Sequence, residues 1–263
     1  MFSPLERLLA FRYLRSRRSE GFISVIAWFS FAGITLGVST LIIVMSVMNG
    51  FRAELVNRIL GLNGHLGISS IYGNEISDFD SLTAAVAENP NILAAIPQIE
   101  SQVLVSTNNN TFGGIVRGVI WSDLAVRTPL WDSLSSDVIT RFREKEVILI
   151  GKTMARNLNL TEGDSLALLS PKGKNTAFGT LPSRKVFKIG GIFDVGMHEY
   201  DSNFVFMPLA SAQDFFAMPN KVSGVELYVK TPSKARVIKE ELSKNLEDHL
   251  AIFDWMDRNK NFL

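Results

Sequence analysis

A long stretch without charged residues dominates the N-terminal part of the chain. From Gly21 to Phe51 no Asp, Glu, Lys or Arg occurs. A helix of roughly 20 apolar residues is enough to cross a bilayer core of about 30 Å, and this stretch is too long for the apolar region of a cleaved signal peptide. We therefore predict a transmembrane helix over residues 21–51. Apolar positions continue beyond it at helical spacing, at Phe51, Leu55, Ile59 and Leu62. That spacing predicts a helical stalk over residues 52–64.

The charges that flank this helix predict its orientation. It is preceded by five arginines, Arg7, Arg12, Arg15, Arg17 and Arg18. The flank of a span that is richer in Lys and Arg faces the cytoplasm. Ser3-Pro4-Leu5-Glu6 has the form of a capping box with proline at the first helical position. We expect residues 1–20 to form a cytoplasmic amphipathic helix at the membrane surface and the chain after the span to be extracytoplasmic.

Residues 65–263 alternate short apolar strands with helices. Strand-like stretches occur near residues 65–71, 98–105, 111–120, 147–151, 165–170, 186–195, 203–209 and 222–229. Helices are indicated at residues 79–88, 152–160, 210–216 and 233–245. Residues 171–185 have no hydrophobic period and contain Gly and Pro, which predicts a long loop. The order of elements predicts an α+β domain with mainly antiparallel strands.

Composition excludes several functions. The chain of 263 residues is 46% hydrophobic and has no cysteine, so thiol chemistry, disulfides and Cys-based metal sites are absent. Its 27 basic and 26 acidic residues give a formal net charge of +1. Nucleic acid is therefore not expected as a partner, because there is no global basic field to hold a phosphate backbone.

Motifs for catalysis are missing as well. The histidines, His65, His198 and His249, lie far apart in the sequence, so they indicate neither a metal site nor a catalytic pair. Gly151-Lys152-Thr153 does not form a phosphate-binding loop, because Glu146 occupies the position of the first glycine. The acidic residues around Asp194, Glu199 and Asp201 fit solvated turn residues better than a carboxylate pair. We predict no catalytic residues, no metal site and no enzyme activity.

Several sequence blocks resemble one known family. Residues 34–38, 44–55 and 58–61 are similar to the first membrane helix and stalk of lipoprotein-releasing ABC transporter permeases of the LolC/LolE type. Residues 147–171, 181–213 and 222–230 resemble successive blocks of that family's periplasmic domain, in the same order and at similar spacing. The resemblance covers nearly the whole chain and implies a fold of the MacB-like periplasmic core type.

The resemblance also implies a function. Members of this family extract lipoproteins from the bacterial inner membrane and pass them to a periplasmic chaperone. The implied partners are an ABC ATPase subunit, a second permease copy or paralogue, the chaperone, lipoprotein substrates and membrane lipid. ATP would bind to the ATPase subunit, and this chain itself would bind no cofactor. Family permeases have four spans, so we expect the chain to be an N-terminal fragment. A related permease of the MacB or FtsX type and a stand-alone single-span anchor remain alternatives.

The resemblance places two candidate sites. The family's chaperone-docking hook corresponds to residues 171–182 with a basic pad after it, which implies docking through Phe178, Gly179, Pro182, Arg184 and Lys185. Asn175-Thr176-Ala177 differ from the hook tip of the paralogue that docks the chaperone. Two alternatives therefore remain: the chain is the non-docking paralogue, or this segment is only a solvated connection between two strands. Contact with lipoprotein or lipid and a helix interface are expected at Gly33, Gly37, Met45, Met48 and Phe51, since small residues let helices approach closely in lipid.

Overall fold

The computed structural model describes residues 4–6, 8–9, 21–73, 75–107, 111–144, 147–176 and 179–254. It divides into two compact units, Met1–Asn57 and Arg58–Leu263, the second of which we call the C-terminal domain. Residues 4–6 and 8–9 are helical. The rest of the amphipathic helix expected over residues 1–20 lies outside the described residues.

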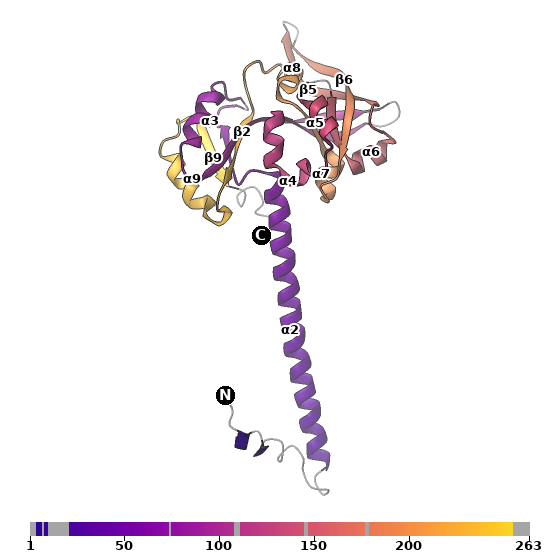
Figure 1. Cartoon of the computed structure of the whole chain (residues 1–263), viewed down its shortest axis with the longest axis vertical. Helices are drawn as coiled ribbons and strands as arrows, with labels where there is room; N and C mark the ends of the chain where they lie inside the picture. The colour runs from indigo at the N-terminus through magenta and orange to yellow at the C-terminus, as the bar shows by residue number, and fades with distance from the viewer. Residues whose placement is uncertain are drawn as a thin grey trace. The chain divides into compact units, whose positions relative to one another are not determined.

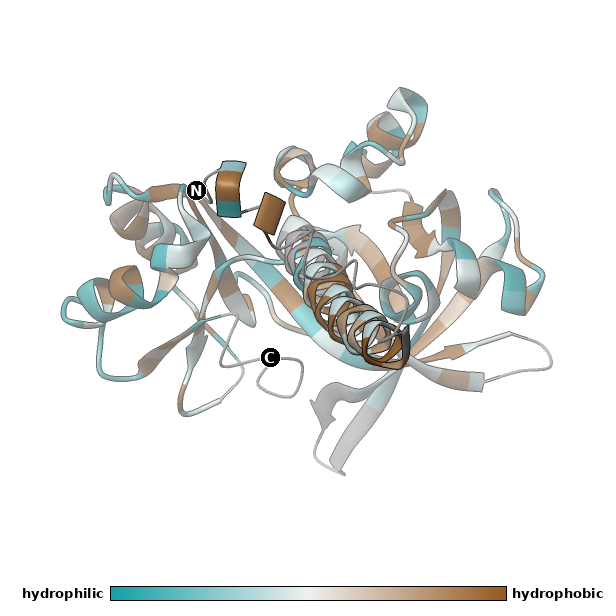
Figure 2. Cartoon of the chain, turned by 90° about the horizontal axis from the view of Figure 1, so that it is seen from below, coloured by the Kyte–Doolittle hydropathy of each residue, from teal (hydrophilic) through white to brown (hydrophobic). Residues whose placement is uncertain are grey.

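The predicted membrane helix is present as α2 (Gly21–Leu62). Its segment Phe22–Phe51 is long and apolar enough to cross a membrane by length and composition, and Figure 2 shows the hydrophobic residues along it. Large side chains such as Phe29 are exposed, here by 76%. A continuous apolar surface of this size is not stable in water and calls for lipid or other helices around it. The helix ends at Leu62, two residues before the predicted end of the stalk.

The C-terminal domain is built from short helices and strands (Figure 1). Its helices are α3 (Phe79–Ala87), α4 (Thr128–Trp131), α5 (Ser136–Arg143), α6 (Lys152–Leu158), α7 (His198–Asn203), α8 (Leu209–Phe215) and α9 (Ala235–Ser243), with 3₁₀ turns η1 (Trp121–Val126) and η2 (Pro232–Lys234). Its strands are β1 (Leu66–Ser70), β2 (Ile92–Ser106), β3 (Thr111–Val119), β4 (Val147–Gly151), β5 (Ser165–Thr176), β6 (Gly179–Phe193), β7 (Phe204–Pro208), β8 (Gly224–Val229) and β9 (Leu250–Asp254).

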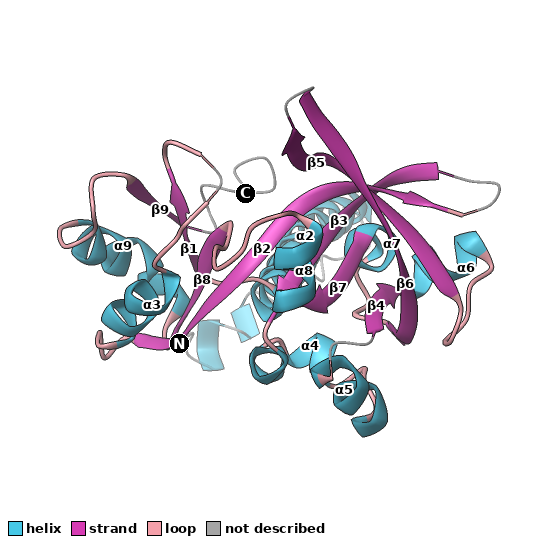
Figure 3. Cartoon of the chain, turned by 90° about the horizontal axis from the view of Figure 1, so that it is seen from above, coloured by secondary structure: helices cyan, strands magenta, loops and turns pink. Residues whose placement is uncertain are grey.

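The strands form one nine-stranded sheet that closes on itself at one end. Their order is β3-β7-β4-β6-β5-β2-β8-β1-β9, and β3 also pairs with β2. Strands β2 to β7 therefore form a closed barrel, while β8, β1 and β9 extend from the first half of β2 as an open sheet. Figure 3 shows β2 running from one group into the other. Among the described strands, β3–β7 and β4–β6 pair in parallel and the other pairs are antiparallel.

Two apolar clusters hold these layers together. The larger fills the barrel and the space under α3, α8 and α9, with fully buried residues such as Ile99, Ile150 and Leu168. The smaller packs α5 and the end of α2 against the barrel wall, with Leu62, Phe142 and Phe206 among its members. Burying each such side chain contributes about 1.5–3 kcal/mol relative to an exposed one.

The structure confirms the α+β domain and its mainly antiparallel strands, and it corrects several local predictions. The predicted loop over residues 171–185 is wrong, because β5 and β6 continue through most of it as a hairpin. Residues 198–203, read as a turn, form α7, and β9 was not predicted. Helix α5 was not predicted either; it begins after Ser135, whose hydroxyl accepts a hydrogen bond from the Val138 amide.

Candidate functional site

The candidate docking element is the hairpin of β5 and β6. Its strands pair antiparallel from Ser165↔Lys188 to Thr176↔Gly179, with an irregularity between Ser170 and Lys174. Pro171 and Pro182 lie within this irregular region, where the ladder can lose the hydrogen bonds that proline cannot donate. A bulge of this kind bends the strand that carries it. Figures 1 and 3 both show the hairpin extending beyond the other strands of the barrel.

The hairpin brings together most of the residues expected to dock a chaperone. Gly179 begins β6, and Pro182, Arg184 and Lys185 follow on the same strand with exposed side chains. Successive residues of a strand point to opposite faces, so Arg184 and Lys185 extend to different sides of the hairpin. The ammonium of Lys185 lies 5.2 Å from the centre of the Phe187 ring. Phe178, the expected apolar anchor, lies outside the described residues.

An exposed apolar surface lies at the base of the hairpin. Two cross-strand rows form it, Leu104–Leu169–Arg184 and Ser106–Ala167–Val186. Residues directly opposite each other share one face of a sheet, and the neighbouring inward positions Val105 and Leu168 are fully buried. Leu104 and Val186 are 41% and 54% exposed. We call this outer face, Leu104, Ala167, Leu169, Arg184 and Val186, the root face.

A recess adjoins the root face. It has a volume of about 460 Å³ and is lined in part by Gln102, Leu104, Gly113 and Pro171. At Gly113 an added Cβ would meet nothing within 4 Å, so the surface is open there. Apolar centre, basic edge and adjoining recess are features of protein-docking surfaces.

The residues expected to contact lipid or lipoprotein all lie on α2. At Gly33 and Gly37, one turn apart, an added Cβ would meet nothing within 4 Å. Met45, Met48 and Phe51 are 60% exposed or more. The hydroxyl of Thr40, which follows these glycines on α2, donates to the Leu36 carbonyl at 2.7 Å. The hydroxyl therefore has a hydrogen-bond partner without water.

The end of α2 is held by a polar network that the sequence analysis did not predict. The side-chain amide of Asn63 donates to the hydroxyl of Tyr200 and accepts a hydrogen bond from the Arg117 guanidinium at 3.0 Å. The Tyr228 hydroxyl donates to the Leu62 carbonyl at 3.4 Å. His65 follows, and its Nδ1 accepts the Val229 amide at 2.8 Å. Burial lowers the pKa of His65, against the opposing effect of Glu226.

Two buried arginines support this junction. Arg117 of β3 is paired with Glu100 of β2 and lies 5.0 Å over the Phe204 ring. Its own burial lowers the pKa of Arg117, but the carboxylates of Glu226 and Glu100 outweigh that effect and raise it. Arg127 is completely buried and donates to Glu226 at 2.7 Å and to Gln98 at 3.0 Å.

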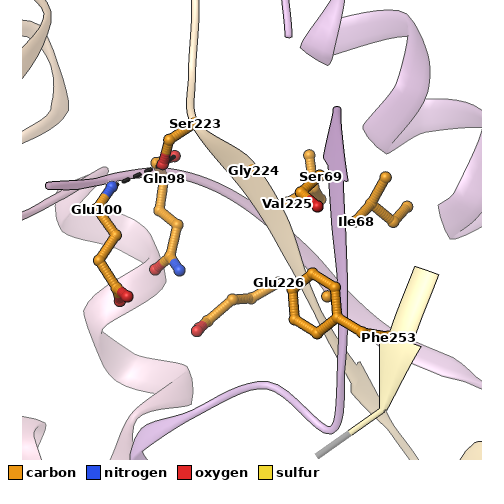
Figure 4. A pocket seen from close by; sticks show the side chains of 10 residues that line it. Ile68, Ser69, Gln98, Glu100, Ser223, Gly224, Val225, Glu226 and Phe253 are labelled. Atoms are coloured by element: carbon orange, nitrogen blue, oxygen red, sulfur yellow. Dashed lines mark hydrogen bonds between the residues drawn. The ribbon is translucent and has the colours of Figure 1, made fainter. Parts of the chain in front are cut away.

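A polar pocket opens beside this network. It has a volume of about 360 Å³, and Figure 4 shows the side chains of Gln98, Glu100 and Glu226 extending to the same side of β2 and β8. Phe253 of β9 closes another part of the wall. Because Glu100 and Glu226 pair with Arg117 and Arg127, the acidic wall serves to neutralise the two buried cations.

The described residues contain no group of three or more His, Cys, Asp or Glu that could hold a metal ion. Two of the histidines contact other side chains: the Nε2 atom of His198 lies 3.3 Å from the Ser202 hydroxyl, and the Nδ1 atom of His249 lies 3.2 Å from the Glu247 carboxylate.

Lys152, the residue of the rejected phosphate-loop motif, forms an ion pair. Its Nζ atom lies 2.6 Å from Asp194, and the hydrogen bond from Lys152 lowers the pKa of the Asp194 carboxyl.

The acidic residues near residue 200 have structural roles. Asp201 accepts the Val195 amide at 3.0 Å, and burial raises its pKa. Asp194 accepts the Gly196 amide at 3.3 Å in the preceding turn. Asp201 is 4% exposed and lies on α7, so the expectation of a solvated turn residue is wrong for it. The backbone amides that both carboxylates accept give them a structural role.

Comparison with known families decides the wider relationship. The model of the MacB-like periplasmic core domain matches residues 27–247. The chain belongs to this family. It is 31% identical over 99% of its length to the lipoprotein-releasing system transmembrane protein LolC of Xylella fastidiosa (strain Temecula1 / ATCC 700964), of which it covers 63%. It is 29% identical over its full length to LolC of Neisseria meningitidis serogroup B, again covering 63%.

A LolE protein and a solved structure are also similar. The LolE protein of Haemophilus influenzae is 26% identical over 95% of this chain and 61% of its own length. The periplasmic region of MacB from Actinobacillus actinomycetemcomitans aligns with 79% of this chain and 96% of its own at 12% identity and a TM-score of 0.45. The chain thus spans about three fifths of the length of these curated relatives.

The sequence analysis did not predict the polar network at the end of α2, although the sequence contains a signal for it. Arg117 and Glu226 stand in the middle of apolar strand sequences, FGGIVRGVI and GVELYV. A charge at such a position is buried, and a buried charge needs a partner of opposite sign. The sequence could have predicted that partners exist, but not that Glu100 pairs with Arg117 and Glu226 with Arg127.

Proposed function

We propose that this chain supplies the first membrane helix and the external domain of a permease subunit in a lipoprotein-releasing ABC transporter. The observation that carries the proposal is its likeness to LolC proteins over 99% of the chain, which includes both α2 and the C-terminal domain. Transport also needs the part of the relatives that this chain does not span. The activity, the substrates and the partners are therefore proposed for the whole transporter.

The two candidate surfaces take separate roles in this proposal. The exposed apolar face of α2 contacts membrane lipid and the acylated end of a lipoprotein, because the acyl chains of both lie in the hydrocarbon core beside the apolar side chains of the helix. The hairpin and the root face bind the periplasmic chaperone through apolar contacts at Leu104 and Val186 and through the cationic Arg184 and Lys185. In this proposal the N-terminus is cytoplasmic and the C-terminal domain periplasmic, which the arginines before α2 support.

The chemistry is assigned to another subunit. The relatives are named transmembrane proteins of a lipoprotein-releasing system, and the carboxylates of Glu100 and Glu226 in this chain are paired with arginines. We assign ATP hydrolysis to a separate ATPase subunit. A second permease copy or paralogue completes the membrane part.

Photo-crosslinking in living cells tests the docking role. A photoreactive phenylalanine replaces Phe178 or Val186 in the native gene product, and the chaperone is expected in the crosslinked band. The matched control is Tyr72, an aromatic residue 85% exposed after β1 in the open part of the sheet. Equal crosslinking from Tyr72, or none from the hairpin positions, would contradict docking at the hairpin.

Depletion of the gene product tests the transport function itself. Lipoproteins destined for the outer membrane are expected to accumulate in the inner membrane within a few generations. A normal lipoprotein distribution after complete depletion would favour a related export permease or a stand-alone membrane anchor. Co-purification of an ATPase with the native gene product then separates these two, because the anchor needs none.

A further inference from the structure

The connection between α2 and the first strand is only three residues long, Asn63 to His65. A short connection can still be flexible if its residues are free to rotate. Here each residue is fixed by a different kind of contact. The connection therefore behaves as a joint with defined geometry.

Gly64 and His65 fix the joint to the open sheet. A Cβ added at Gly64 would lie 2.9 Å from the Cβ of Glu226 and 3.0 Å from the Leu227 amide nitrogen, so the backbone lies directly against β8. The His65 amide donates to the Leu227 carbonyl at 2.8 Å. The Val229 amide donates to the ring of the same histidine. These contacts tie the connection to β8 on both sides of Tyr228.

Asn63 fixes the same joint to the barrel through its side chain. Its oxygen accepts from Arg117 of β3 and its nitrogen donates to Tyr200 of α7. Both partners are themselves held in place, since Arg117 pairs with Glu100 and Tyr200 stacks on Phe204 with ring centres 4.5 Å apart. An amide is suited to this position because it carries a donor and an acceptor on one short side chain.

We propose that Asn63 is a positioning residue that locks the end of α2 to barrel strand β3, so that the helix end and the barrel move as one body. The lock deepens the proposed transport function, on which its use in the cell rests. With the lock intact, a displacement of the helix end reaches the barrel and its hairpin. Without it, the helix end keeps its contacts with β8 and the apolar packing of Leu62 but loses its polar attachment to β3 and α7, and part of the displacement is lost.

Hydrogen exchange of the whole chain in detergent micelles tests the lock directly. Asn63→Leu removes both hydrogen bonds at similar volume, and Asn63→Asp keeps the acceptor for Arg117. We expect amide exchange at residues 62–66 to become at least about tenfold faster in Asn63→Leu, as expected for losing a partly buried hydrogen bond to a charged group. Asn63→Asp should restore most of the protection. Gln213→Leu is the matched control, because it removes the amide that donates to the Lys221 carbonyl at 3.1 Å.

A second variant covers poor folding of Asn63→Leu. Tyr200→Phe removes only the hydroxyl and keeps the ring stack on Phe204. It should change exchange at residues 62–66 in the same direction by a smaller factor. Unchanged exchange in a folded Asn63→Leu or Tyr200→Phe, or an equal increase in Gln213→Leu, overturns the lock.

The transporter assembled with its ATPase tests what the lock does. Lipoprotein transfer per ATP hydrolysed should fall at least about fivefold in Asn63→Leu and recover in Asn63→Asp, with ATP hydrolysis changed by less than about twofold, because positioning and not chemistry is altered. An unchanged transfer per ATP overturns the proposal. If the wild-type complex transfers no lipoprotein at all, the proposed function fails instead. The hydrogen-exchange comparison then decides by itself whether Asn63 fixes the end of α2 to β3.

Discussion

The buried ion pair between Arg127 and Glu226 should dominate the response of the C-terminal domain to mutation. Arg127→Met keeps most of the side-chain length but removes the charge. The side chains of Arg127 and Glu226 are 0% and 4% exposed and meet at 2.7 Å. Removing one partner of such a pair leaves an uncompensated buried charge, which costs about 3–5 kcal/mol.

This cost translates into a large thermal shift. Domains of 150–250 residues lose roughly 2–4 °C in Tm per kcal/mol, so Arg127→Met should lower Tm by about 6–20 °C. Near-ultraviolet circular dichroism of the chain in detergent measures it, because aromatic packing reports the folded domain. The double variant Arg127→Met with Glu226→Gln should recover most of the loss, since neither position then carries an unpaired buried charge and Arg117 keeps its partner Glu100.

A surface arginine provides the control. Arg141 pairs with Asp137 at 2.8 Å, but these side chains are 34% and 77% exposed, so Arg141→Met should cost only about 0.3–0.5 kcal/mol. If Arg127→Met shifts Tm no more than Arg141→Met, the reasoning about burial is refuted. If the double variant is no more stable than Arg127→Met, the unpaired Glu226 is not the cause.

Three further changes have defined outcomes. Because burial lowers the pKa of folded His65 below its ordinary value of 6.5, the unfolded state binds the extra proton as pH falls through about 6.5, and Tm should fall more in wild type than in His65→Gln. Gly151→Ala places a Cβ 2.3 Å from the Asp201 carbonyl oxygen, so urea unfolding should show a loss of about 1–3 kcal/mol or more. Arg184→Glu reverses a charge on the root face and should weaken chaperone binding, by surface plasmon resonance, about fivefold at low salt and less at high salt.

Each of these has its own control. His249→Gln replaces a histidine outside the junction and is the control for the substitution itself, and a parallel loss of Tm in His65→Gln and wild type would argue against a role of His65. Gly113→Ala adds a methyl group to open space, so equal destabilisation there would show that steric contact is not responsible. Lys230→Glu makes the same charge reversal on an exposed residue outside the hairpin, and an equal effect on binding would point to net charge alone.

The membrane helix and most strands could be predicted because their signal is local. A stretch of 31 residues without charge, Gly21 to Phe51, admits few structures besides a span. Buried strands such as Val147–Gly151 are continuous apolar runs, and α3 ends near Pro90 as its sequence indicates. In these places the environment of each residue follows from its immediate neighbours.

The hairpin and the junction could not be predicted because their signals are not local. Residues 171–185 show no alternation and contain Gly and Pro, so their sequence resembles a loop, although β5 and β6 pair through most of this segment. The Asn63 contacts join residues 54 and 137 positions apart. Nothing within a sequence window shows that Asn63, Arg117 and Tyr200 meet.

The pairing of β1 sets the order in which the domain can be made. Leu66 pairs with Leu227 on one side and with Asp254 on the other, so the open sheet joins the first strand to the last two. During synthesis, α2 and β1 emerge long before their neighbours exist. Closing so long a stretch of chain is entropically costly and slow. The nascent protein must therefore hold β1 unpaired until β8, which ends at Val229, has left the ribosome, and with one unpaired edge until β9 has followed. This exposes the segment to aggregation while the chain is being made.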